Sequence, residues 1–223
     1  MKPFLISLTS DVDGVKSNYL DSVHKLGNSV EPIMVAFQPQ PPQVNFQVIP
    51  VGYPYPGNLG RFKYFPQGFD DNDTIVFTDA SDVIFQCPLP EISHQKIYVS
   101  DEYDLWGADN WWKSKLDDYD FHELDGKPIY CMGTWAMPYF YVKDLLKFMK
   151  DHQFRFDSAD WSDQLMFNWW LKGQNFYINS ELFCSLYDGF GKGVIKKKDG
   201  VFCDFFGKPI SVVHGNGDSK IYL

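Results

Sequence analysis

Short apolar runs that alternate with helical patterns constrain the fold of this chain more than any other feature. In the first half, strand-like runs occupy residues 3–10, 31–37, 44–52, 74–85 and 94–100. Helical patterns occupy residues 17–27 and 57–65. In the first of these helices, Leu20, Val23 and Leu26 share one side and Gly27 is a typical end. Strands separated by helices predict an α/β fold with a mostly parallel sheet.

The second half of the chain has a less regular pattern. It predicts helices over about 141–151 and 160–171, and strands near 175–179 and 209–215. Neither an internal repeat nor a linker divides the chain, and 223 residues suit one domain with a sizeable core. We therefore expect a single domain.

The net charge of −9 limits the classes of partner that the chain can bind. Broad nonspecific nucleic-acid binding relies on lysine and arginine at phosphates, so this acidity argues against it. Three lysines at 196–198 could form a local basic patch, but the Asp-Gly that follows them favours a solvated turn.

Two further features indicate a cytoplasmic protein. The four cysteines, Cys87, Cys131, Cys184 and Cys203, form no C-x-x-C pair and have apolar neighbours, so we expect reduced, half-buried thiols. The first ten residues contain only a short apolar run, which predicts a strand rather than a signal peptide. No stretch has the length of a membrane span, and we expect no membrane partner.

Two acids follow the apolar run of residues 75–77. Asp79 and Asp82 lie three residues apart across a turn, so both carboxylates could face one cation. They could instead cap a turn and a helix. A phosphatase of the haloacid dehalogenase kind also places an aspartate after a strand, but its second acid lies two residues on rather than three.

About 130 residues later, the segment VVHGNGDSK places His214, Gly217 and Lys220 in an H-x-x-G-x-x-K spacing. A histidine after a strand is often only a hydrogen-bonded residue. Here the glycines allow close backbone approach to a ligand, and the lysine could neutralise a diphosphate. One imidazole with two carboxylates suits a hard or borderline divalent cation.

Several segments, in order, resemble glycosyltransferases of the GT-A fold. The nearest likeness is to the glycosyltransferase domain of the procollagen lysyl hydroxylases, and the last segment is also similar to glycogenin. The segments are FLISLTSDVDGVKSNYLDSV, TIVFTDASDVIF, IYVSDEYDLWG, WSDQLMFN and VVHGNGDSK. The resemblance covers nearly the whole chain. It implies a Rossmann-like GT-A domain over 1–223, with a nucleotide-binding half at 1–110 and an acceptor and sugar half at 111–223.

The resemblance also implies roles for individual residues. Asp79, Asp82 and His214 would bind Mn²⁺ or Mg²⁺, and the cation would act as Lewis acid for departure of the diphosphate. Asp163 and Asp160 would lie near the sugar or the acceptor hydroxyl, although Asp160 also suits a helix cap. The residues expected to contact the nucleotide-sugar are Thr9, Ser10, Arg61, Ser81, Glu102, Trp106, Gly217 and Lys220.

One segment departs from the family pattern. Where the family has an Asn-Ser-Gly-Gly loop that shapes the sugar and acceptor site, this chain has YCMGTWAMPYF at 130–140. Cys131 and Met132 replace the polar pair, and Trp135 and Met137 add bulk. The identities of the sugar and the acceptor therefore do not transfer with the resemblance.

The expected function is metal-dependent transfer of a sugar from a UDP-sugar to a hydroxyl group, with retention at the anomeric carbon. The acceptor hydroxyl could belong to a protein, a glycan or a modified DNA base, and the small size suits a phage or bacterial enzyme. Two alternatives stay open: a metal-dependent phosphohydrolase that uses the same acids, and a catalytically silent sugar-binding module on the same fold.

Overall fold

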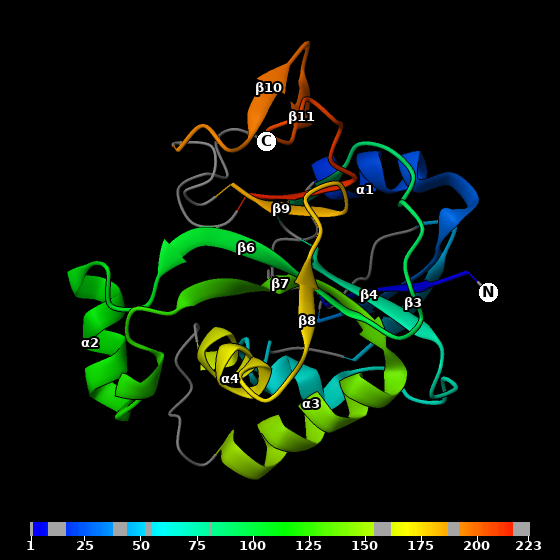
Figure 1. The fold of residues 1–223 in the computed structure, drawn as a ribbon. Coiled ribbons are helices and arrows are strands. Elements are labelled where there is room, and N and C mark those ends of the chain that lie inside the picture. Colours follow the sequence, from blue (N-terminus) through cyan, green and yellow to red (C-terminus); the bar gives the residue numbers. More distant parts are fainter. Residues whose placement is uncertain are drawn as a thin grey trace.

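A seven-stranded sheet forms the centre of the computed structural model, which describes residues 2–8, 17–37, 44–51, 55–80, 82–153, 162–186 and 192–215 (Figure 1). The strand order is β3-β2-β1-β4-β7-β6-β8. The strands are β1 (Phe4–Leu8), β2 (Glu31–Ala36), β3 (Gln47–Pro50), β4 (Thr74–Asp79), β6 (Ile97–Leu105), β7 (Pro128–Pro138) and β8 (Phe176–Ile178).

Most neighbouring strands of this sheet run parallel. β3, β2, β1 and β4 pair in parallel, as do β6 and β8. Strand β7 lies between β4 and β6 and is antiparallel to both. The prediction of an α/β fold with a mostly parallel sheet is thus confirmed.

Strand β7 corrects the expectation of a loop around residues 130–140. Every residue from Cys131 to Pro138 is buried. The strand is covered on both faces, so its side chains are mostly apolar, with Thr134 as a buried polar exception, and do not alternate with polar ones. The chain therefore passes through the middle of the sheet where a loop was expected.

Helices and a small sheet cover the two faces of the central sheet (Figure 1). One face packs against η2 (Gly60–Tyr64), α3 (Tyr139–His152) and α4 (Ser162–Leu171). The other face packs against α1 (Ser17–Val23), η1 (His24–Ser29) and a three-stranded sheet. Ile75 and Phe77 belong to the first core and Val76 to the second, because successive strand residues point to opposite faces.

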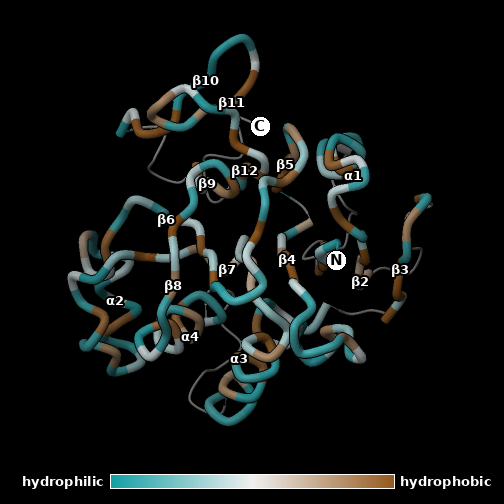
Figure 2. The backbone as a smooth tube through the Cα atoms, turned by 45° about the vertical axis from the view of Figure 1, so that its right-hand side comes forward, coloured by the Kyte–Doolittle hydropathy of each residue, from teal (hydrophilic) through white to brown (hydrophobic). Residues whose placement is uncertain are grey.

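The three-stranded sheet has the order β5-β12-β9. Its strands are β5 (Val83–Phe85), β12 (Val212–His214) and β9 (Phe183–Ser185). Residues 83–85 were expected to continue the strand at 74–79, but they leave the central sheet and join this one. In Figures 1 and 2 the small sheet lies between the central sheet and the hairpin of β10 (Lys196–Lys198) and β11 (Val201–Cys203).

The hairpin shows which structure the three consecutive lysines at 196–198 adopt. All three lysines are exposed residues of β10, and the predicted turn lies at Asp199 and Gly200. Both turn residues have positive φ, 51° and 82°, as two-residue hairpin turns commonly require. The turn is confirmed, while the triplet itself is a strand.

Other predicted elements differ mainly at their ends. The helix at 17–27 is α-helical only to Val23, and Gly27 adopts a non-helical conformation with φ 54° inside η1. The segment at 57–65 forms the 3₁₀ helix η2. Helices α2 (Asn110–Tyr119) and η3 (His122–Leu124) were not predicted; the Asp109 side chain caps α2 by accepting from the Trp112 amide at 2.7 Å.

The cysteines and the helix lengths complete the fold. All four cysteines are free; Cys87 is half-buried and the other three are buried. Within the described residues, none of the helices combines the length and apolarity that a bilayer crossing requires.

Candidate metal centre

Asp79 and Asp82 lie where the chain leaves the central sheet. Strand β4 ends at Asp79, whose register partner on β1 is Leu8. Strand β5 of the small sheet begins directly after Asp82. The two acids therefore flank the crossing between the sheets, at the carboxyl end of β4, where open α/β sheets bind their ligands.

Sheet pairing brings His214 to the same place. His214 ends β12, where it pairs with Val83 of β5 and Ser185 of β9. The Gly215 amide donates to the Asp82 carbonyl at 2.8 Å. Backbone hydrogen bonds thus hold the histidine beside an acid about 130 residues away in sequence.

The three side chains form a compact ligand set. One ligand atom from each of Asp79, Asp82 and His214 lies within 4.8 Å of the others. His214 Nε2 is 3.2 Å from Asp82 Oδ1 and 3.7 Å from Asp79 Oδ2. Ligand atoms on one divalent cation are at most about 4–5 Å apart, so this oxygen and nitrogen set could hold a divalent cation.

Burial and charge act in opposite directions on His214. Burial lowers its pKa, but Cys131 and Asp82 raise it, and the net effect is a pKa well above the usual value. A proton on the imidazole would balance the neighbouring carboxylates when no cation is bound. A bound cation would replace that proton.

Arg61 joins the ligand set to a further acid. Its side chain is buried, with Nη1 2.6 Å from Asp79 Oδ1 and Nη2 3.2 Å from Asp163 Oδ2. Burial lowers the pKa of Arg61, but Asp79 and then Tyr55 and Asp163 raise it, so the guanidinium stays charged. Because Asp79 gives Oδ1 to Arg61, its Oδ2 is the oxygen that faces His214.

Asp163 occupies the first turn of α4 and is also buried. Its pKa is raised to about 6 as the net of opposing effects. Burial raises the pKa most, Arg61 lowers it and Asp79 raises it. One of its oxygens accepts from the Gln164 amide at 2.9 Å, and the other meets Arg61. The structure therefore brings the predicted residue Asp163 to the metal ligands through Arg61.

An outer layer of contacts surrounds His214, with Cys131 from β7, Glu102 from β6 and Gln164 from α4. Of these three residues, the resemblance had implied only Glu102. Cys131 Sγ lies 3.0 Å from His214 Nδ1, so the other ring nitrogen faces the carboxylates. Burial raises the pKa of Glu102, while hydrogen bonds from Gln164 and Cys131 lower it. A run of contacts therefore connects Gln164, Glu102, Cys131 and His214.

Gly133 explains how β7 passes so close to the ligands. A Cβ atom at this position would lie 2.4 Å from His214 Cε1 and 2.6 Å from Asp79 Oδ2. Only glycine leaves room for both side chains. A lone glycine among the bulky residues of CMGTWAM was the available signal, because strand glycines often mark close approach.

Of the remaining predicted residues, two lie in the described part of the chain and six do not. Glu102 belongs to the outer layer described above. Trp106 is fully buried in the main core and packs against Trp112, with ring centroids 4.6 Å apart. Its predicted contact with a donor stays a prediction. Six predicted residues, Thr9, Ser10, Ser81, Asp160, Gly217 and Lys220, lie outside the described residues.

No protein-family model matches this chain, and no curated protein matches it. The case for a function therefore rests on the residues and their geometry.

Proposed function

We propose that this protein is a metal-dependent glycosyltransferase of the GT-A kind, which transfers a sugar from a UDP-sugar to a hydroxyl acceptor with retention. The observation that carries the proposal is the convergence of Asp79, Asp82 and His214 at the carboxyl end of β4. The sequence likeness of the segments around these residues supports the same reading.

Asp79, Asp82 and His214 would hold the cation. When bound, the cation supplies Lewis-acid stabilisation of the diphosphate that leaves the sugar. The chain itself contributes fixed charges around that position. The interaction of such preorganised charges with the reacting groups is stronger in a site that excludes water.

Arg61 and Asp163 have separate tasks in this proposal. Arg61 holds Asp79 through Oδ1, which fixes the carboxylate that faces His214. Asp163 is a buried carboxyl group next to this cluster, where it could accept a proton or stabilise positive charge on the sugar. Because Arg61 contacts both acids, it sets their separation.

Calorimetry would test the donor first. We expect UDP to bind in the presence of Mn²⁺ and to bind far more weakly after chelation. The Asp82→Asn variant should lose the Mn²⁺-dependent part. Asp71→Asn is the matched control, because Asp71 is an exposed acid that pairs with Lys143 on the surface.

Activity assays would then separate the alternatives. A panel of nucleotide-sugars with Mn²⁺ should give free nucleotide without inorganic phosphate. Release of inorganic phosphate from nucleotides or sugar phosphates would favour a phosphohydrolase. Donor binding without any turnover, across donors and acceptors, would favour a silent sugar-binding module.

A further inference from the structure

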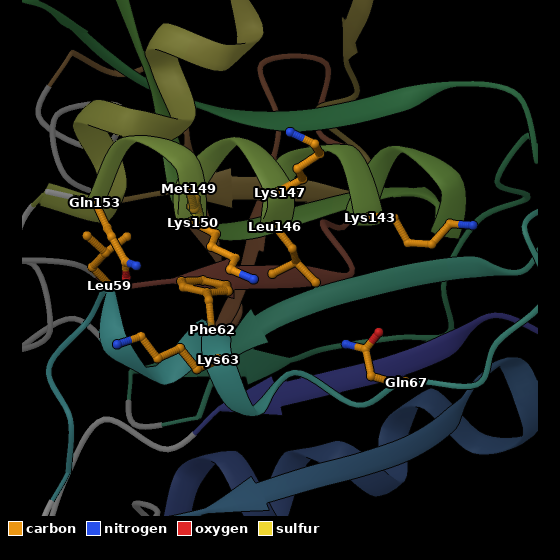
Figure 3. Close-up of a pocket in the computed structure, with 10 residues that line it drawn as sticks. All are labelled: Leu59, Phe62, Lys63, Gln67, Lys143, Leu146, Lys147, Met149, Lys150 and Gln153. Carbon is orange, nitrogen blue, oxygen red and sulfur yellow. The ribbon is translucent and has the colours of Figure 1, made fainter.

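A groove separates η2 from α3 on the face of the central sheet that packs against the helices (Figure 3). Its volume is about 570 Å³, within the range of about 300–1,000 Å³ that is typical of ligand sites. The lining residues are Leu59, Phe62, Lys63, Gln67, Lys143, Leu146, Lys147, Met149, Lys150 and Gln153.

The floor of the groove is apolar but small. Phe62 and Met149 are only 5% and 2% exposed, and Leu59 and Leu146 are half-buried against the main core. Figure 3 shows Leu146 reaching from α3 toward Phe62 of η2. The apolar floor thus consists of two side chains from the η2 side of the groove and two from α3.

Lysines surround this floor. Four of the ten lining residues are lysines and none is acidic, although the whole chain carries a net charge of −9. Lys143 pairs with Asp71, and Lys147 pairs with Asp151. Among the described residues, no salt bridge occupies Lys63 or Lys150.

The two lysines without a salt bridge come from opposite walls. Lys63 belongs to η2, and Lys150 extends from α3 toward Phe62, whereas Lys147 points to the other side of the helix (Figure 3). An occupant with negative charge on both sides of an apolar group would complement this arrangement.

We propose that this groove binds an acidic peptide segment of a partner protein. An apolar side chain of the segment lies on Phe62 and Leu146, and flanking carboxylates pair with Lys63 and Lys150. The proposal uses neither the metal nor the donor, so it stands or falls independently of the proposed function.

The groove also shares an element with the metal centre. Arg61, which pairs with Asp79 and Asp163, lies next to Phe62 and Lys63 in η2. An occupant of the groove therefore contacts the helix that holds Arg61.

Selection from a random short-peptide display library on the intact protein tests the proposal. Enriched peptides should carry at least two acids around an aliphatic or aromatic residue. Fluorescence anisotropy of the enriched peptide should show about tenfold weaker binding to Lys63→Glu and to Lys150→Glu. Lys113→Glu is the matched control, with the same charge change at an exposed lysine of α2 that does not line the groove, and should alter binding less than about twofold.

Three results would overturn the assignment. One is enrichment of peptides without acids, or no enrichment at all. Another is an equal loss of binding in Lys113→Glu and Lys150→Glu, which would indicate only general charge attraction. The third is displacement of the peptide by dodecanoate at lower concentration than the peptide itself, which would identify an acyl ligand. Circular dichroism of each variant checks that the fold is intact.

Discussion

Cys131 Sγ lies 3.0 Å from His214 Nδ1, and both side chains are buried. The thiol thereby occupies one ring nitrogen and directs Nε2 toward Asp79 and Asp82. Groups that orient a metal-binding histidine in this way are usually carboxylates or carbonyls. Here the group next to the histidine is a thiol, and the carboxylate of Glu102 contacts that thiol.

This relationship predicts a loss of metal affinity when the thiol is removed. Cys131→Ala should weaken Mn²⁺ binding by about tenfold or more, because partners of this kind typically contribute that much. Cys131→Ser should recover part of the loss, since a hydroxyl can also meet Nδ1. Calorimetric titration with Mn²⁺ measures both.

Cys203→Ala is the control for this experiment. Cys203 is a buried cysteine of β11, in the hairpin. Its removal should leave Mn²⁺ affinity unchanged even if stability falls. Equal Mn²⁺ affinity in Cys131→Ala and wild type would show that the thiol does not orient His214.

Gly133 predicts a specific steric conflict. The added Cβ of Gly133→Ala would lie 2.4 Å from His214 Cε1, so the histidine or the strand must shift. We expect a stability loss of about 1–3 kcal/mol, the usual cost of overpacking. In a His214→Ala background the same change should cost clearly less, because the nearest clashing atom is gone.

Urea unfolding of the four proteins in this cycle measures the difference. Gly173→Ala is the matched control, because the nearest atom to its added Cβ is an ordinary 3.7 Å away. If Gly133→Ala costs the same with and without His214, the conflict is not with the imidazole.

The candidate metal ligands predict a loss of donor binding when they are replaced, while the fold is retained. Asp82→Asn and His214→Ala should each abolish Mn²⁺-dependent UDP binding. Both side chains are more buried than their loop positions suggested, so His214→Ala should also lower the melting temperature. Asp82→Asn changes little volume and is the cleaner variant. Unchanged UDP affinity with Mn²⁺ in Asp82→Asn would remove it from the ligand set.

The candidate ligands of this site could be predicted from the sequence, but the residues that surround them could not. Asp79 and His214 end strands and Asp82 directly precedes one, and their chemistry is recognisable locally. The contacts of Cys131 and Gly133 depend on β7, which pairs with β4 and β6 in the middle of the sheet. A strand covered on both faces has no alternating pattern, so its apolar residues gave no sign of register.

The pairing of Arg61 with Asp163 was hidden for a similar reason. The two residues lie on separate helices, 102 positions apart. The resemblance alone implies that both residues lie near the donor or the sugar. Only the packing of η2 and α4 on the same face of the sheet brings them together.

Asp163 leads to a prediction about turnover. Asp163→Asn should lower the transfer rate by ~10²-fold or more while donor affinity stays nearly constant, if the carboxyl group assists proton transfer or stabilises the sugar. If Asp163 only completes the first turn of α4 and pairs with Arg61, the variant should lose stability and keep normal turnover. Steady-state kinetics and thermal unfolding of the same preparation distinguish these outcomes.

Asp163 also predicts how stability depends on pH. Burial raises the pKa of its carboxyl group to about 6, despite the opposing effect of Arg61, whereas an aspartate in an unfolded chain titrates near about 3.9. Between these values the folded protein holds a proton that the unfolded chain has released. The stability that Asp163 contributes is therefore fully present below about pH 4 and is lost as pH rises through about 6.

An asparagine at this position does not titrate, so Asp163→Asn should lose less stability than the wild type between about pH 4 and 7. Urea unfolding at a series of pH values measures, for each of the two proteins, the slope of the free energy of unfolding against pH. Asp151→Asn is the control, because the pKa of this exposed acid is lowered by Lys147, an effect of opposite sign. If the free energy of unfolding changes equally with pH in wild type and Asp163→Asn, Arg61 keeps Asp163 ionised throughout. The site would then carry a permanent carboxylate at this position rather than a group able to exchange a proton near neutral pH.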